Sequence, residues 1–320
     1  MRALLLLILF SGCELSLDID VPQADRVLII DAPFEVGQPW RVGVGHSMAV
    51  QQGRLQDHDT AVFGATVEIY EGDTLVERLV QDRDPIYPPR PVLAPATTST
   101  QNYRGHTTPI AGRTYTLVVR HPDFPEARAT SSTPVPLDSA RFVGSATRDG
   151  RQFSGRLEVD DDASASHYAV HLTQQPGGDP EQSDVTGLFF TSPTTIFERP
   201  LPNPFNDIDE SVFTAAFFAD DAFENAHYPL DFDVGFYNDQ GLYCGDNPSP
   251  TCTAFGIYAN VHAITPEYFA YVRSLIGYEG LDADDNPLGE PIRLVGNVEG
   301  GIGLFAGRSA PILVELAERP

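Results

Sequence analysis

The chain has 320 residues, with 20 basic residues against 45 acidic ones and a formal net charge of −25. Hydrophobic residues make up 42% of the chain, which excludes a disordered protein, and the length allows two domains with real cores. The absence of any basic cluster argues against binding to nucleic acid, because neutralising phosphates needs such clusters. All 20 basic residues are arginine, which suggests a GC-rich genome or a salty habitat.

The N-terminus has the pattern of an export signal. Met1 and Arg2 precede a wholly apolar run over residues 3–10, and Ser11 and Gly12 precede Cys13. Eight apolar residues are too few to cross a hydrocarbon core of about 30 Å as a helix, so residues 1–12 are predicted to be a signal peptide. The pattern resembles the bacterial lipoprotein signal, in which cleavage precedes a cysteine that becomes acylated. A plain secretory signal is the alternative. With Cys13 as the site of lipid attachment, residues 13–25 form a tether.

Residues 26–134 read as an all-β domain. Apolar and polar residues alternate, or form compact apolar runs, at residues 27–31, 41–48, 65–70 and 115–119. Period two with one apolar face is typical of half-buried strands. We predict an immunoglobulin- or transthyretin-like sandwich, followed by a proline-rich linker at residues 133–136.

Residues 137–318 are predicted to form a second β-rich domain with one short helix. Strand patterns occupy residues 152–159, 167–172, 212–218, 230–236 and 255–261, and residues 292–316 read as two strands broken by glycines. A helix is predicted near residues 265–276, because Thr265 suits the N-cap and Pro266 suits the first helical position. The predicted fold class is therefore mostly β.

Cys244 and Cys252 are the remaining cysteines. An even pair in an exported protein favours a disulfide, here one that closes a turn-rich loop. A metal site would need further ligands, and no neighbouring cysteine or histidine cluster supplies them. Free thiols are the other alternative.

Two further groups of residues are candidate metal ligands. Asp282, Asp284 and Asn286 have the oxygen spacing that opens a calcium loop, but Pro287 and Arg293 occupy positions where an EF-hand has Gly and Glu. These residues, and the acidic cluster at 160–162, are expected to be solvated turns, with calcium as a weak alternative. His167 and His171 share a face of a predicted strand, but two histidines without a third ligand indicate a structural or surface role. No metal and no cofactor is predicted.

The common catalytic signatures are missing from the sequence. No Gly-x-Ser-x-Gly elbow, His-Glu-x-x-His helix or Walker loop is present, so we predict that the protein is not an enzyme. The glycines at 301, 303 and 307 are expected at bulges or where backbones pack closely rather than in a dinucleotide loop. Aromatic pairs at 189–190 and 217–218, with Tyr228, are expected to be mostly core, and some are candidates for a contact patch.

Several segments resemble one known family, the domain of unknown function 4249 (DUF4249). The segments that carry the resemblance are residues 13–22, 64–69, 112–119, 219–223, 266–272 and 297–307. Phe10 and the absence of lysine beside the anchor depart from the family pattern. The resemblance implies an outer-membrane lipoprotein of the kind found in Bacteroidota, in families often encoded near TonB-dependent transporters, and it implies no catalytic residues.

The expected function is therefore a binding or assembly role at the outer membrane, on its periplasmic or cell-surface side, as an accessory to a TonB-dependent transporter. The first alternative is a surface adhesin that binds glycans or proteins. The second is a cryptic hydrolase, because 45 acidic residues offer many carboxylate pairs.

Overall fold

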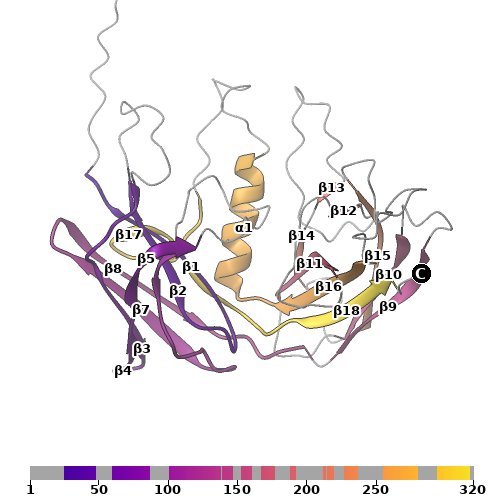
Figure 1. The fold of residues 1–320 in the computed structure, drawn as a ribbon, viewed down its shortest axis with the longest axis horizontal. Coiled ribbons are helices and arrows are strands. Elements are labelled where there is room, and N and C mark those ends of the chain that lie inside the picture. The colour runs from indigo at the N-terminus through magenta and orange to yellow at the C-terminus, as the bar shows by residue number, and fades with distance from the viewer. Residues whose placement is uncertain are drawn as a thin grey trace, which may run out of the picture.

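The computed structural model describes residues 25–47, 60–86, 101–137, 139–146, 153–160, 167–176, 188–191, 212–213, 215–219, 227–236, 255–279 and 294–317. Within these ranges the chain forms eighteen strands and one α-helix. Figure 1 shows two groups of strands with the helix between them. The prediction of a mostly β protein with one short helix is confirmed.

The first group is a sandwich of two sheets. One sheet has the order β17 (Gly301–Arg308), β1 (Leu28–Glu35), β2 (Arg41–His46), β6 (Gln101–Arg104) and β5 (Val80–Ile86). The other has the order β4 (Thr74–Arg78), β3 (Thr66–Glu71), β7 (Thr114–His121) and β8 (Phe124–Ser132). We call this unit the first sandwich.

Period-two alternation builds the core of the first sandwich. Every second residue of β1, from Leu28 to Phe34, is buried, and Val67 and Ile69 of β3 belong to the same core cluster. Four aromatic rings fill its centre: Phe34 lies 4.6 Å from Phe305 and 5.1 Å from Trp40, and Trp40 lies 5.0 Å from Tyr115, measured between ring centroids. Burying rings of this size supplies a large share of the apolar area on which the sandwich depends.

The second group also consists of two sheets. One has the order β13 (Val212–Phe213), β12 (Leu188–Thr191), β15 (His227–Phe236), β10 (Phe153–Asp160) and β9 (Ser139–Ala146). The other has the order β14 (Ala215–Ala219), β11 (His167–Pro176), β16 (Phe255–Ala263) and β18 (Ile312–Ala317). We call this unit the second sheet pair.

The two units share chain segments at their edges. Strand β17 pairs in parallel with β1 over eight positions, from Leu28 with Gly301 to Glu35 with Arg308. The predicted division of the sequence assigns residues 301–308 to the C-terminal part, whereas in the structure they are an edge strand of the first sandwich. The chain passes between the units three times: from β8 to β9, back from β16 through α1 to β17, and from β17 to β18 (Figure 1). Three crossings tie the units more closely than a single linker would.

The helix α1 (Pro266–Glu279) lies between the two units (Figure 1). The hydroxyl oxygen of Thr265 accepts a hydrogen bond from the backbone N–H of Tyr268 at 3.4 Å, which confirms Thr265 as the N-cap. The backbone N–H of Thr265 donates to the carbonyl oxygen of Gly307 at 3.1 Å, so β17 fixes where the helix begins. None of the described helices is long and apolar enough to cross a membrane.

Candidate functional site

Ionisable side chains from both units meet around α1. The outer face of the first sandwich contributes Asp31, Glu35 and Arg308, which follow the alternate positions of β1 and β17 that do not enter the core. Strands β11 and β16 contribute His171 and His262, and the helix contributes Tyr268 and Tyr271. We call these seven residues the junction cluster. Buried groups with shifted pKa values are the usual mark of a functional site, so this cluster is the first candidate.

Charge on the first-sandwich side is partly compensated. The Nη2 atom of Arg308 lies 2.7 Å from Oε2 of Glu35, and the two residues are also partners in the β1–β17 register. Asp31 keeps a small exposed fraction as a residue, but its carboxyl group is buried, and this burial raises its pKa to about 6. At neutral pH the Asp31 carboxylate is therefore ionised, and its buried charge lowers the free energy of unfolding.

The second sheet pair contributes two neutral imidazoles. Burial, with a smaller contribution from the positive charge of Arg308, lowers the pKa of His171 to about 3. Burial and Arg308 also lower the pKa of His262, whose Nδ1 atom lies 3.0 Å from the carbonyl oxygen of Ser309. Because a carbonyl oxygen only accepts, Nδ1 of His262 carries the proton, and the ring is held as one neutral tautomer.

The helix covers the cluster with two phenols. Burial raises the pKa of Tyr268, and the nearby carboxylates of Asp31 and Glu35 add to the effect while Arg308 opposes it. Burial likewise raises the pKa of Tyr271, and Asp31 adds to that shift. Both hydroxyls therefore keep their protons throughout the physiological range.

Replacing Asp31 by asparagine should stabilise the protein at pH 7. The raised pKa means that the folded state holds a proton near pH 5 that the unfolded state has lost. The contribution of the Asp31 carboxyl to the free energy of unfolding is therefore fully present below about pH 4, and it is lost as pH rises through about 6. Asp31→Asn removes the charge, so we expect a gain of up to about 3 kcal/mol in the free energy of unfolding at pH 7.

The gain should shrink to nothing near pH 4, where the wild-type carboxyl is protonated as well. Urea unfolding at pH 4, 5, 6 and 7 measures this. A matched control is Asp123→Asn, which changes the same group at an exposed turn position. An equal gain at all four pH values would show that the buried charge of Asp31 is not the cause.

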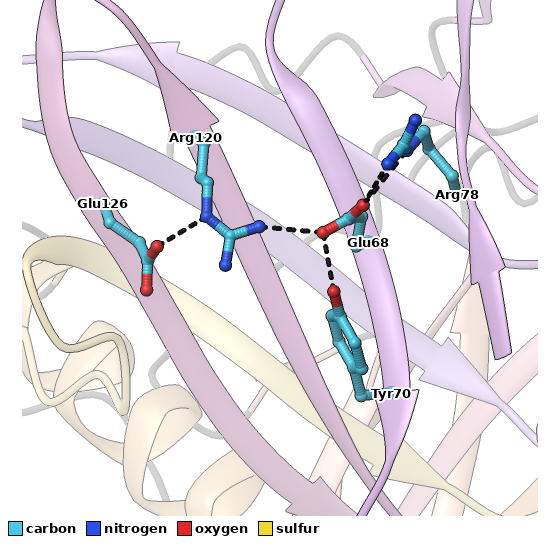
Figure 2. A network of polar contacts seen from close by, with 5 residues as sticks. All are labelled: Glu68, Tyr70, Arg78, Arg120 and Glu126. Carbon is cyan, nitrogen blue, oxygen red and sulfur yellow. Dashed lines mark hydrogen bonds and ion pairs between the residues drawn. The ribbon is translucent and has the colours of Figure 1, made fainter. Parts of the chain in front are cut away.

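A second polar network lies on the outer face of the four-stranded sheet of the first sandwich (Figure 2). Glu68 of β3 is only 4% exposed. Its carboxylate accepts from Nη2 of Arg78 at 2.7 Å, from the Tyr70 hydroxyl at 2.8 Å and from Nη1 of Arg120 at 2.8 Å. Arg120 also donates to Glu126 at 2.6 Å.

The Glu68 network joins all four strands of that sheet, because its members come from β4, β3, β7 and β8. The hydrogen bonds from Arg78 and then Tyr70 hold the pKa of Glu68 below its usual range. Both carboxylate oxygens are occupied and both guanidinium groups are paired, so the arrangement acts as a structural clamp rather than as a ligand site.

The glycine-rich segment before and within β17 is a packing feature. A Cβ atom on Gly303 would overlap the carbonyl oxygen of Ile30, and one on Gly307 would overlap the carbonyl oxygen of Ser132. Asn297 anchors the preceding turn, since its side-chain amide donates to the carbonyl oxygen of Phe305 at 2.7 Å and accepts from the Phe305 N–H at 2.9 Å. The structural interpretation of these glycines, rather than a phosphate loop, agrees with this geometry.

The other predicted site residues fall into two groups. His167 and His171 lie on the same face of β11, as predicted, and contact Phe269 and Phe217 at ring-centroid distances of 4.6 and 5.7 Å. Among the described residues, no group of three or more His, Cys, Asp or Glu side chains could hold a metal ion. The remaining predicted site residues lie outside the described ranges: Cys13, Cys244, Cys252, Asp282, Asp284 and Asn286.

The predicted core aromatics on β14 are also placed. Phe217 and Phe218 are both buried: Phe217 faces the helix and Phe218 packs 5.2 Å from Tyr168. Sequence reasoning missed Asp31, Arg308 and His262, because each stands alone in an ordinary strand pattern. A charged residue at an outward position between apolar ones, as at Asp31, was the one available signal.

Comparison with known proteins gives a family. The model of the domain of unknown function DUF4249 matches residues 14–310, which is nearly the whole chain. The chain belongs to the DUF4249 family. This match confirms the resemblance seen in the sequence, and every member of the junction cluster lies inside the matched DUF4249 range.

Other comparisons add no functional information to DUF4249 membership. No curated protein matches the chain. A solved structure described as manganese lipoxygenase of Gaeumannomyces graminis with part of zonadhesin of Komagataella pastoris is similar at 10% identity. The similarity covers 75% of this chain and 89% of that chain, with a TM-score of 0.20. At this score it supports no argument about fold or function.

Proposed function

We propose that this DUF4249 protein is a lipid-anchored protein of the bacterial outer membrane that binds or assembles with a partner and has no catalytic activity. The observation that carries the proposal is the N-terminal pattern, in which the apolar run of residues 3–10 is followed by Ser11, Gly12 and Cys13. Acylation of Cys13 would hold the first sandwich about fifteen residues from the membrane, since β1 begins at Leu28.

The distribution of charge supports an orientation in which the first sandwich is the part of the protein nearest the membrane. Residues 26–137 contain ten arginines and twelve acidic residues, whereas residues 138–320 contain nine arginines and twenty-nine acidic residues. An anionic membrane surface repels the strongly acidic part and tolerates the nearly neutral part. A tether attached before β1 would therefore keep the first sandwich near the membrane and direct the second sheet pair away from it.

Acylation at Cys13 can be tested directly. With labelled palmitate in a bacterial host that processes lipoproteins, we expect labelling of the wild type and of the control Cys244→Ser. We expect Cys13→Ser to lose the label and to leave the membrane fraction. Retention of the label in Cys13→Ser, or an intact mass that includes residues 1–12, would refute the anchor.

The partner is proposed to be a TonB-dependent transporter, which follows from the family resemblance rather than from a contact in the structure. Purification of the acylated protein from its own membrane in mild detergent tests this. A β-barrel receptor that co-purifies in a fixed ratio supports the assembly role. Its absence, together with retention of the protein on a glycan array, would favour the adhesin.

A further inference from the structure

Within the described part of the chain, one imidazole of the junction cluster lacks a hydrogen-bond partner at one of its ring nitrogens. His171 Nε2 is buried and has no hydrogen-bond partner among the described residues. Its ring meets the rings of Phe217 and His262 edge to face, each at a centroid distance of 5.7 Å. A proton added to His171 would thus create a buried cation without an acceptor, which is among the most costly changes a fold can undergo.

The charged and titratable groups around His171 come from every neighbouring element, and only some can help it. Strand β17 presents Arg308, β16 presents His262, and β11 itself presents His167 on the same face. Strand β1 brings Asp31 and Glu35 close to Tyr268 of the helix, and Glu35 is already paired with Arg308. The helix presents the two phenols, and β14 presents the ring of Phe217, which does not titrate. Besides burial, it is the positive charge of Arg308 that lowers the pKa of His171.

Among the residues that the structure describes, the contact that holds these groups together is small. On the helix side, its apolar cluster comprises five buried described residues, Ala169, Phe217, Ile264, Phe269 and Val272. Hydrogen bonds between described residues accompany it: Thr265 N–H to the Gly307 carbonyl at 3.1 Å, Ser309 N–H to the Ala263 carbonyl at 2.8 Å, Ala263 N–H to the Ser309 hydroxyl at 3.0 Å, and His262 Nδ1 to the Ser309 carbonyl at 3.0 Å. By contrast, the core cluster of the first sandwich has eighteen buried members.

We propose that this junction is a proton-operated latch, in which protonation of His171 and His262 separates β11 and β16 from α1 and β17 and frees the two units to move relative to each other. In the open state both imidazoles reach water and no longer face Arg308 at close range. The first sandwich keeps its own core. The latch does not depend on the lipid anchor or on the proposed partner.

The size of the response follows from proton linkage. Each imidazole that is neutral when closed and titrates normally when open raises the opening equilibrium about tenfold per pH unit below about 6.5. Two imidazoles give up to about 100-fold per unit. Asp31 faces the helix from the other side. If opening also exposes the Asp31 carboxyl, a fall in pH favours the closed state at this group. This reduces the rise of the opening equilibrium by about tenfold per pH unit between about pH 6 and 4. The net effect is at least about tenfold per unit.

Hydrogen exchange on the full chain tests the latch. Between pH 6.5 and 4.5, after correction for intrinsic exchange rates, we expect protection of residues 266–279 and 301–308 to fall at least about 100-fold. Protection of β3 and β7, in the core of the first sandwich, should stay within about threefold. Scattering measurements on the same samples should show an increase in the radius of gyration.

Matched variants separate the latch from general acid sensitivity. His171→Phe keeps an aromatic ring against Phe217, and His262→Asn keeps an amide that can donate to the Ser309 carbonyl. The double variant should lose less than about tenfold of protection over the same pH range. His106→Asn, which removes an exposed histidine, should respond like the wild type.

Two results would overturn the proposal: a double variant that loses protection as the wild type does, or a wild type whose β3 and β7 lose protection in step with α1. If the double variant does not fold, ring-carbon NMR of histidine in the wild type replaces it. The latch requires the His171 and His262 signals to change at the pH at which α1 loses protection, and titration at any other pH refutes it.

Discussion

Gly303→Ala should lower the free energy of unfolding by at least about 3 kcal/mol. Gly303 has a φ of +115°, which residues with a side chain rarely adopt, and a Cβ atom there would overlap the backbone of Ile30. Gly303 and Ile30 are register partners in the β1–β17 ladder, so the overlap cannot be relieved by rotating a side chain. The strand must move, and Phe305, two residues later, must leave its place among the core rings.

Gly112→Ala provides the control for Gly303→Ala. Gly112 also has a positive φ, of +72°, but nothing lies within 4 Å of where its Cβ would stand. It therefore carries the backbone cost alone, about 1 kcal/mol. Denaturant unfolding of both variants measures the difference. If the two losses are equal, backbone conformation accounts for the effect and close approach of β17 to β1 does not.

Local sequence patterns predicted most of the strands because each strand carries its own period. The alternation in residues 65–70 and 115–119 reappears in β3 and β7, and Val67, Ile69, Tyr115, Leu117 and Val119 are all core residues. The cap at Thr265 was also predictable, since it depends on neighbouring residues alone. These features need no knowledge of distant partners.

Features that depend on distant pairing could not be predicted in this way. Strand β17 pairs with β1 across more than 260 residues, and its own pattern says only that it is a strand. Glu68 stands at an outward position of β3, where polar residues are normally solvated. It is buried because β4 and β7 bring Arg78 and Arg120 to it, beside Tyr70 of its own strand. Burial of a charge was decided by its partners, not by its neighbours in the chain.

The junction cluster has the same origin. His171 and His262 lie on paired strands, but Arg308 reaches them only because β17 joins the first sandwich while β16 and β18 stay in the second sheet pair. The sequence shows that His167 and His171 share a face of one strand. It does not show that the ring of His171 contacts the ring of His262. No local period links residues 171, 262 and 308.

The largest effect is expected from the loss of β17, which joins the first sandwich from a distant part of the chain. Residues 26–134 expressed alone should not fold cooperatively. This fragment contains eight of the nine strands of the first sandwich and lacks β17. Removing β17 opens the edge of β1 and takes away the fully buried Phe305, whose ring lies 4.6 Å from that of Phe34. Losing one buried Phe ring costs about 3 to 5 kcal/mol, and the lost strand pairing adds to this. A domain of this size has only about 5 to 15 kcal/mol to lose.

Restoring the strand should restore the fold. A fusion of residues 26–134 through a flexible Gly/Ser linker to residues 294–309 supplies β17 at high effective concentration. We expect this fusion to show a cooperative thermal transition and dispersed amide NMR signals, and the same fusion with Phe305→Ser to show neither. A cooperative transition in the bare fragment would mean that the first sandwich folds without β17. In that case the two units would be independent domains, and the crossing strands would serve only to connect them.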